Sequence, residues 1–253
     1  MTYAAYKPDR SPRPAVSRDE WLKAREALLA REKELTHLRD EVSAARRELP
    51  WVKIEKNYVF DSPDGKVTLA DLFDGRSQLA VYHFMLTPGK DHICPGCSFI
   101  ADHVDGARQH FEHADLSFAA ISRAPLSQIV PVKKRMGWQF RWVSSNGNDF
   151  NYDFGVSFKP DQFDNGTASY NYRKLGGSER LSDGHGTSIF SRNDKGEVFH
   201  TYSTYARGDE VLLGAFSWLD LTPKGHNEDT IMGWLRLHDE YEDAPAHAAS
   251  CCA

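Results

Sequence analysis

The motif Cys94-Pro95-Gly96-Cys97 constrains this chain most, because it stands between a strand pattern and a helix pattern. Residues 79–86 before it form a short apolar run rich in β-formers, which predicts a central strand buried on both faces. In residues 98–113, apolar side chains recur at spacings near three and four, which predicts a helix. Cys94 is then the N-cap and Pro95 the first helical residue, where the missing N–H of proline costs nothing.

The N-cap position favours a thiolate at Cys94. Free backbone N–H groups and the helix dipole lower the pKa of such cysteines from about 8.5 to roughly 3.5–7.5. Two cysteines at this spacing serve either thiol–disulfide chemistry or metal binding. Five histidines that could complete a metal site lie nearby in the sequence: His83, His92, His103, His110 and His113. There is no second Cys-x-x-Cys, so we expect redox chemistry and keep a Cys/His metal site as the weaker alternative.

The composition is that of a globular protein with a large core. The chain has 253 residues, of which 40% are hydrophobic, and a net charge of -5. An acidic balance gives no electrostatic reason to expect a nucleic acid or an anionic membrane as partner. Residues 1–18 hold no apolar run of signal-peptide length, and no stretch approaches the roughly 18 apolar residues of a membrane span. We therefore expect a cytoplasmic protein.

The N-terminal part predicts a loose leader followed by one long helix. Residues 1–16 are rich in proline and polar side chains, and Ser17 with Glu20 forms a capping-box pattern. From there to Leu49 the chain has neither glycine nor proline, which predicts a helix of about thirty residues. Large apolar residues recur in it every seven positions: Trp21, Leu28, Leu35, Val42 and Leu49. The helix either docks on its own domain or forms a homodimer as a coiled coil.

Residues 51–235 predict one α/β domain with a mixed sheet, because strand and helix patterns alternate and a hairpin pattern follows them. Residues 159–187 interrupt this order with five glycines and few aliphatic side chains, which predicts a surface insertion that could act as a lid. Residues 236–253 are acidic and Ala-rich, which predicts a disordered tail. That tail holds the other two cysteines, Cys251 and Cys252, and we expect their adjacency in the sequence to be incidental. Four cysteines so placed form no disulfide scaffold.

Four pieces of the sequence resemble the opening of the thioredoxin-like branch that includes peroxiredoxins and membrane-tethered disulfide reductases. They are Asp64-Gly65-Lys66, Leu69-Ala70-Asp71-Leu72, the run 79–85, and Cys94 to Cys97. More narrowly, residues 17–225 resemble DUF899, a bacterial family described as thioredoxin-like or as dithiol–disulfide isomerases. The matching stretches are 135–138, 149–154 and 198–208. The resemblance implies a thioredoxin-like three-layer α/β/α fold with a mixed central sheet, to which the long helix and the Gly-rich insertion are added.

The resemblance also implies a catalytic pair. Cys94 is the attacking thiol and Cys97 the resolving thiol of a dithiol–disulfide oxidoreductase or isomerase, and Pro95 with Gly96 shapes the oxidised ring. The implied substrate is a thiol or a disulfide, in a protein or a small molecule. No cofactor is expected beyond the redox-active disulfide itself, and no metal.

Two further side chains are candidates for supporting roles. His83, in the strand that leads to the motif, could tune the thiolate or transfer protons, although a hydrogen-bonded core histidine explains it equally well. Arg123 could stabilise a thiolate or an anionic substrate, but a salt-bridged arginine is the plainer interpretation.

The sequence departs from its relatives at two places. Thioredoxins carry a cis-proline just before the hairpin strand, and no proline stands near residues 186–188 here. Peroxiredoxins carry Thr or Ser three residues before the reactive cysteine, where this chain has Asp91. A thioredoxin fold that has lost its chemistry and serves as a binding module therefore remains the second interpretation.

Overall fold

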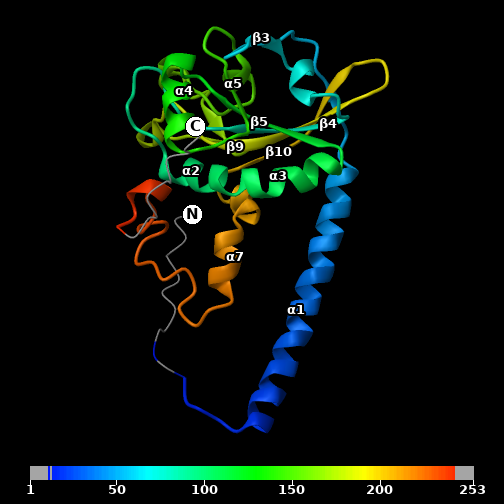
Figure 1. Cartoon of the computed structure of the whole chain (residues 1–253), viewed down its shortest axis with the longest axis vertical. Coiled ribbons are helices and arrows are strands. Elements are labelled where there is room, and N and C mark those ends of the chain that lie inside the picture. Colours follow the sequence, from blue (N-terminus) through cyan, green and yellow to red (C-terminus); the bar gives the residue numbers. More distant parts are fainter. Residues whose placement is uncertain (1–10, 12, 243–253) are drawn as a thin grey trace, which may run out of the picture.

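The structure is a computed structural model, and it describes residue 11 and residues 13–242 (Figure 1). Its helices are α1 Arg18–Arg47, α2 Pro95–Asp102, α3 Val104–His113, α4 Leu126–Arg135, α5 Phe150–Asp153, α6 Pro160–Asp164 and α7 Gly214–Asp220, and its 3-10 helices are η1 Ala70–Phe73, η2 Gly177–Glu179, η3 Ala206–Leu212 and η4 His238–Glu240. Its strands are β1 Val52–Lys53, β2 Val59–Ser62, β3 Gly65–Thr68, β4 Gln78–His83, β5 Leu116–Ser122, β6 Arg141–Ser144, β7 Ser169–Tyr170, β8 Arg173–Lys174, β9 Gly186–Arg192 and β10 Val198–Tyr205.

The main sheet is mixed, with the strand order β1-β10-β9-β4-β5-β6-β2-β3. At its centre β4 and β5 are parallel, with Val81 opposite Ala119. On its other side β4 pairs with β9 in antiparallel orientation, with His83 opposite Gly186, and β9 forms a hairpin with β10. The chain thus passes from β4 through the dithiol helix to β5 and returns by the β9–β10 hairpin. This is the thioredoxin-like order that the sequence predicts.

Side chains of β4 alternate between two apolar cores, as the period of a strand requires. Tyr82 faces a core that it shares with Cys97 and Ile100 of α2 and with Phe216 of α7. Leu79 and Val81 face the opposite core, which also contains the side chains that η1 and α5 contribute. Because each face of the sheet is covered by helical elements, the expected three layers are present, although the second helical layer is made of short helices.

The predicted helix over 98–113 is two helices instead of one. α2 ends at Asp102, and α3 begins at Val104. His103 stands at the break, where its Nδ1 lies 2.6 Å from the carbonyl oxygen of Phe99 and its Nε2 accepts a hydrogen bond from the N–H of Ala215 at 3.0 Å. The side chain of His103 thus links α2 to the start of α7, a contact that helical periodicity does not reveal.

The long helix forms as predicted but does not dock on its own domain. Its capping box is present, with Ser17 Oγ accepting from the N–H of Glu20 at 3.3 Å, and it continues for 30 residues. None of its residues is buried. Figure 1 shows that α1 leaves the body at its C-terminal end and runs away from it. There the Arg46 guanidinium lies 5.6 Å from the centre of the Tyr202 ring.

The insertion and the tail are more ordered than the sequence predicts. The insertion carries α6, β7, β8 and η2 and has a small apolar core of Phe158, Ala168 and Leu175. Its action as a lid stays a prediction. The expected disordered tail does not begin at residue 236, because Leu237 is buried and η4 follows it. The leader residues 1–10 and 12, and residues 243–253 with Cys251 and Cys252, lie outside the described residues.

Candidate active site

The dithiol lies at the junction that the sequence predicts, just beyond the end of β4 at the start of α2. Cys94 is the N-cap of α2 and Pro95 its first helical residue. The Cys94 sulfur accepts from the N–H of Cys97 at 3.4 Å, and the Ser98 hydroxyl donates to the Cys94 carbonyl at 3.0 Å. Cys94 is half-buried, whereas Cys97 is fully buried. The two thiols therefore differ in access, as an attacking and a resolving thiol should.

The environment of Cys94 lowers its pKa to about 6. The largest cause is the hydrogen bond from the Cys97 thiol, which outweighs the opposing effect of partial burial. The backbone N–H groups of Cys97 and Gly96 and the imidazole of His185 lower the pKa of Cys94 further. Cys94 is thus largely a thiolate near neutral pH.

Cys97 behaves in the opposite way. Burial raises its pKa well above the ordinary value, and the negative charge of Cys94 adds to the effect. The N–H of Met85 donates to the Cys97 sulfur at 3.4 Å. The hydroxyl of Tyr82 is buried without a conventional hydrogen-bond partner, and it lies close enough to that sulfur to lower the pKa of Cys97 in part. Cys97 therefore holds its proton while Cys94 is ionised.

A histidine and a carboxylate that the sequence did not single out complete the site. His185 stands one residue before β9, and the pairing of β9 with β4 brings it beyond the end of β4, where α2 begins. Its Nδ1 lies 3.1 Å from Asp209 Oδ2, and that carboxylate is only 1% exposed. The ring of His185 lies 6.4 Å from the ring of Tyr82. A buried carboxylate in this position orients the imidazole.

Arg123 supports the site indirectly. Its guanidinium binds both oxygens of Asp183, from Nε at 2.6 Å and from Nη2 at 2.8 Å, and Nη1 donates to Tyr152 Oη at 2.8 Å. The Ser157 hydroxyl also donates to Asp183, at 2.6 Å. Asp183 lies two residues before His185, so this ion pair anchors the segment that carries the imidazole. In the structure Arg123 is therefore a salt-bridged arginine, which is the plainer of the two interpretations.

His83 is not brought to the dithiol. It lies on the opposite face of the sheet from Cys97, because it is the next residue in β4 after Tyr82. There it stacks on Phe150 and Phe154 at 5.5 and 5.9 Å, and its Nε2 lies 2.9 Å from Ser188 Oγ. Burial lowers the pKa of His83 to about 3. It is a neutral core histidine, and the hypothesis that it tunes the thiolate is wrong for this geometric reason.

The loop between the two cysteines is covered by the C-terminal segment. A Cβ added to Gly96 would lie 3.8 Å from Met232 Sδ and 3.9 Å from Cys94 Sγ. Partly buried apolar side chains pack against the core that contains Cys97: Met85, Ile93, Phe99, Met232 and Trp234. Gly96 thus lies next to both the Cys94 sulfur and the Met232 side chain.

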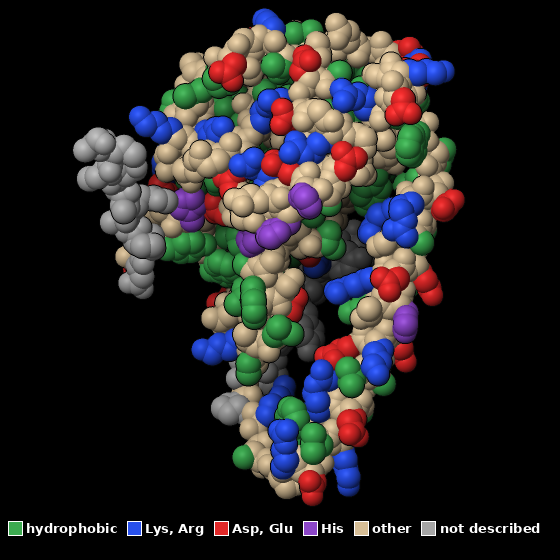
Figure 2. Space-filling model, turned by 45° about the vertical axis from the view of Figure 1, so that its right-hand side comes forward, with side chains coloured by type: hydrophobic (Ala, Val, Ile, Leu, Met, Phe, Trp, Pro, Cys, Tyr) green, Lys and Arg blue, Asp and Glu red, His purple; other side chains and the backbone are tan. Residues whose placement is uncertain are grey.

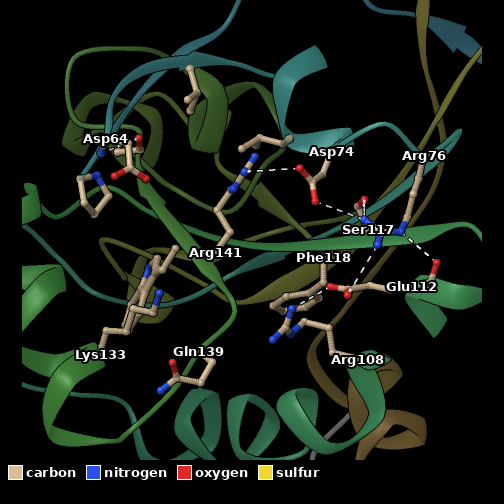
Figure 3. Close-up of a pocket in the computed structure, with 15 residues that line it drawn as sticks. Asp64, Asp74, Arg76, Arg108, Glu112, Ser117, Phe118, Lys133, Gln139 and Arg141 are labelled. Atoms are coloured by element: carbon tan, nitrogen blue, oxygen red, sulfur yellow. Dashed lines mark hydrogen bonds and ion pairs between the residues drawn. The ribbon is translucent and has the colours of Figure 1, made fainter. Parts of the chain in front are cut away.

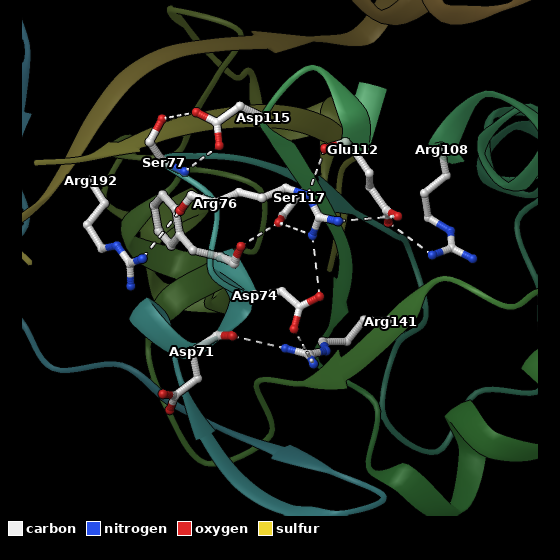
Figure 4. Close-up of polar contacts among 11 residues, drawn as sticks. Asp71, Asp74, Arg76, Ser77, Arg108, Glu112, Asp115, Ser117, Arg141 and Arg192 are labelled. Atoms are coloured by element: carbon white, nitrogen blue, oxygen red, sulfur yellow. Dashed lines mark hydrogen bonds and ion pairs between the residues drawn. The ribbon is translucent and has the colours of Figure 1, made fainter. Parts of the chain in front are cut away.

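A cavity of about 390 Å³ lies at the end of the sheet away from the dithiol, near the starts of β5 and β6 (Figure 3). Several of its charged side chains pair with one another, as Figure 4 shows for Arg76 with Asp74 at 3.3 Å and for Arg108 with Glu112 at 2.9 Å. The Nε of Arg76 also donates to the carbonyl oxygen of Glu112 at 2.9 Å, which ties α3 to the segment before β4. The cavity therefore contains a structural ion-pair network, and it has no thiol in its lining.

Metal binding and membrane crossing are two further properties that the described residues bear on. Among residues 13–242, no three His, Cys, Asp or Glu side chains come together in a way that could hold a metal ion. In the same part of the chain, no helix combines the length and the apolar character that crossing a membrane requires.

Comparison with known proteins gives a family and several structural relatives. A family model described as "Bacterial protein of unknown function (DUF899)" matches residues 10–241. The peroxidoxin BcpB of Mycobacterium tuberculosis is 15% identical, with 66% of this chain and 97% of that chain covered and a TM-score of 0.42. A mutant of peroxiredoxin Q from Xanthomonas campestris is 15% identical, with 68% and 98% covered and a TM-score of 0.46. A search of curated proteins finds no match.

The residues that sequence reasoning missed are Tyr82, His185 and Asp209. Tyr82 sits inside an apolar run, so its hydroxyl draws no attention until the face of the strand is known. His185 stands next to residues 186–188, where the sequence lacks the proline of thioredoxins, and that lack was the available signal. Asp209 lies 24 residues after His185, and no local spacing connects the two.

Proposed function

We propose that this chain, which belongs to the DUF899 family of bacterial proteins of unknown function, is a thiol–disulfide oxidoreductase. Its reacting pair is Cys94 and Cys97. One observation carries the proposal. An accessible sulfur with a pKa of about 6 accepts a hydrogen bond from a buried thiol three residues away, at a helix N-terminus. A structural cysteine needs neither the accessibility nor the lowered pKa.

The first step is attack by the Cys94 thiolate on one sulfur of a substrate disulfide. A bond forms between that sulfur and Cys94, the substrate S–S bond breaks, and the second substrate sulfur leaves as a thiolate that takes up a proton. The N-terminus of α2 faces the developing charge. The product is a mixed disulfide between Cys94 and the substrate.

The second step needs Cys97 to lose its proton. In the mixed disulfide Cys94 no longer carries a charge, so the repulsion that helps raise the pKa of Cys97 disappears. The Met85 N–H and the Tyr82 hydroxyl remain to stabilise the Cys97 thiolate. That thiolate attacks the Cys94 sulfur, the mixed disulfide breaks, and the second substrate thiol leaves. Cys94 and Cys97 have then lost two electrons, and the substrate disulfide has gained them.

The imidazole of His185 is the group best placed to exchange protons during these steps. Its Nδ1 faces Asp209, so Nε2, on the other side of the ring, is the nitrogen left to exchange a proton. We assign to it the stabilisation of the Cys94 thiolate and the transfer of a proton to or from the departing sulfur. The same steps in reverse oxidise a substrate dithiol.

Trapping of the intermediate tests the proposal. With dithiothreitol as the reductant and an aromatic disulfide as the substrate, Cys94→Ser is expected to abolish turnover. Cys97→Ser is expected to accumulate a mixed disulfide at Cys94, visible by intact-mass spectrometry. The matched control is the double variant Cys251→Ser/Cys252→Ser, which should turn over like the parent protein. Full turnover by Cys94→Ser would overturn the proposal, and a normally folded but inactive parent protein would favour a binding module.

A further inference from the structure

The exposed face of α1 is the largest feature of the molecule that the proposed function leaves unexplained. α1 is 30 residues long, none of its residues is buried, and only its C-terminal end contacts the body, through Arg46. The side chains that recur every seven positions remain between 41% and 51% exposed: Trp21, Leu28, Leu35, Val42 and Leu49. In Figure 2 hydrophobic side chains alternate with charged ones along this helix as it descends from the body.

The seven-residue repeat defines the positions of a coiled coil. With Trp21 and its repeats at position a, position d holds Ala24, Arg31, Leu38 and Ala45. A sustained repeat of 3.5 residues per turn places a and d on one seam, which must be covered by a second helix to leave water. Arg31 is the single charged residue on this seam. A polar residue at one core position costs stability and fixes the register of the two helices.

The flanking charges select both the partner and its direction. Position g holds Glu20, Ala27, Glu34 and Glu41, and position e holds Arg25, Glu32, Arg39 and Arg46. In a parallel pair of identical helices, each g residue faces the e residue five positions on in the partner. Three of the four contacts in each direction then join Glu to Arg. An antiparallel pair would set g against g, which is mainly Glu against Glu, and e against e, which is mainly Arg against Arg.

We propose that a second copy of this chain covers the exposed face of α1, as a parallel, in-register, two-stranded coiled coil. The charges of each helix are complementary to those of an identical helix in this orientation. α1 is attached to the body only at its C-terminal end. In a parallel pair the bodies of the two copies therefore lie at the same end of the coiled coil. The dimer does not depend on the proposed redox function, because the dithiol lies in the body.

Site-directed cross-linking tests the direction of the pair. In full-length protein whose four native cysteines are replaced by serine, Ala24→Cys places two thiols face to face on the seam of a parallel, in-register dimer. Mild oxidation is expected to join most of that protein into disulfide-linked dimers. The matched control is Lys33→Cys at position f on the outer face, which should remain unlinked. Equal cross-linking of both variants, or none in Ala24→Cys, would overturn the parallel arrangement.

Sedimentation of the protein with its native cysteines tests the partner. The parent protein is expected to sediment as a dimer, and Leu35→Asp as a monomer with an unchanged body. Glu34→Arg should weaken the dimer at least tenfold, because it sets Arg against Arg39 of the other copy. The double variant Glu34→Arg/Arg39→Glu should restore it. A parent protein that is monomeric at micromolar concentration would overturn the proposal.

Discussion

The ionisation of Cys94 depends on a few atoms around one sulfur. Its pKa of about 6 predicts that alkylation by iodoacetamide rises with a midpoint near that pH, as does the thiolate absorbance at 240 nm. Replacing His185 by Asn removes the charge that favours the thiolate and should move both midpoints to higher pH. The matched control is His110→Asn on the exposed side of α3, which should leave them unchanged. An unshifted midpoint in His185→Asn would remove the imidazole from the site.

His83 makes a prediction about stability instead of activity. Its folded pKa of about 3 lies below the ordinary histidine pKa of 6.5, so the unfolded chain binds a proton first as the pH falls. His83 therefore contributes stability that is complete above about pH 6.5 and is lost progressively below it, by up to about 1.4 kcal/mol per pH unit. Burial lowers the pKa of His200 too, which acts in the same direction. Urea denaturation between pH 4 and 7 should show a shallower pH dependence for His83→Gln than for the parent protein. Equal slopes for the two proteins would contradict this assignment.

The two histidines also show what residue-level reasoning can reach. His83 stands close to the motif in sequence, but the alternation of β4 puts it on the opposite face of the sheet. His185 is 91 residues from Cys94, and the pairing of β9 with β4 brings it to the dithiol. The cysteines themselves were predictable because their chemistry depends on a local junction of strand and helix. Their helpers were not, because they arrive through long-range strand pairing.

At the scale of elements, the close contact between β9 and β10 makes a prediction. A Cβ added to Gly186 would lie 2.4 Å from a ring carbon of Tyr205 and 2.8 Å from the carbonyl oxygen of Thr204. Gly186→Ala should therefore lower the free energy of unfolding by about 1–3 kcal/mol. The matched control is Gly106→Ala in α3, where nothing lies within 4 Å of the added carbon. That change should raise the stability by about 0.5–1 kcal/mol. Both values follow from denaturant titration, and a neutral Gly186→Ala would show that the hairpin adjusts freely.

Elements with a strong local signal were predictable. β4, at Gln78–His83, lies in the apolar run that predicts a strand, and the capping box places the start of α1. The break at His103 was not predictable, because its cause is a contact with Ala215 in a distant helix. The order inside the Gly-rich insertion depends on side chains from across its length, so its composition alone was misleading.

At the scale of the whole molecule, the lowered pKa of Cys94 links redox state to stability. The thiolate exists only in the reduced protein, and its folded pKa lies below the ordinary value near 8.5. The reduced form therefore gains stability over the oxidised form as the pH rises from about 6 to 8.5, amounting to about 1.4 kcal/mol at pH 7. Denaturation of both forms at pH 5.5, 7 and 8.5 should show this growing difference. The same difference at every pH would contradict an ionised Cys94.

The most direct measurement of the central claim is a redox titration of the Cys94–Cys97 pair against glutathione, in protein with Cys251 and Cys252 replaced by serine. We predict a single two-electron transition between a dithiol and a Cys94–Cys97 disulfide. Because the pKa of Cys94, about 6, is lower than that of about 7 for the thioredoxin cysteine, the reduced form is stabilised more, and the potential should lie above the value of about −270 mV found for thioredoxin. The account would be contradicted if Cys94 and Cys97 formed no disulfide in any of the glutathione mixtures and both thiols were still free in the most oxidising one.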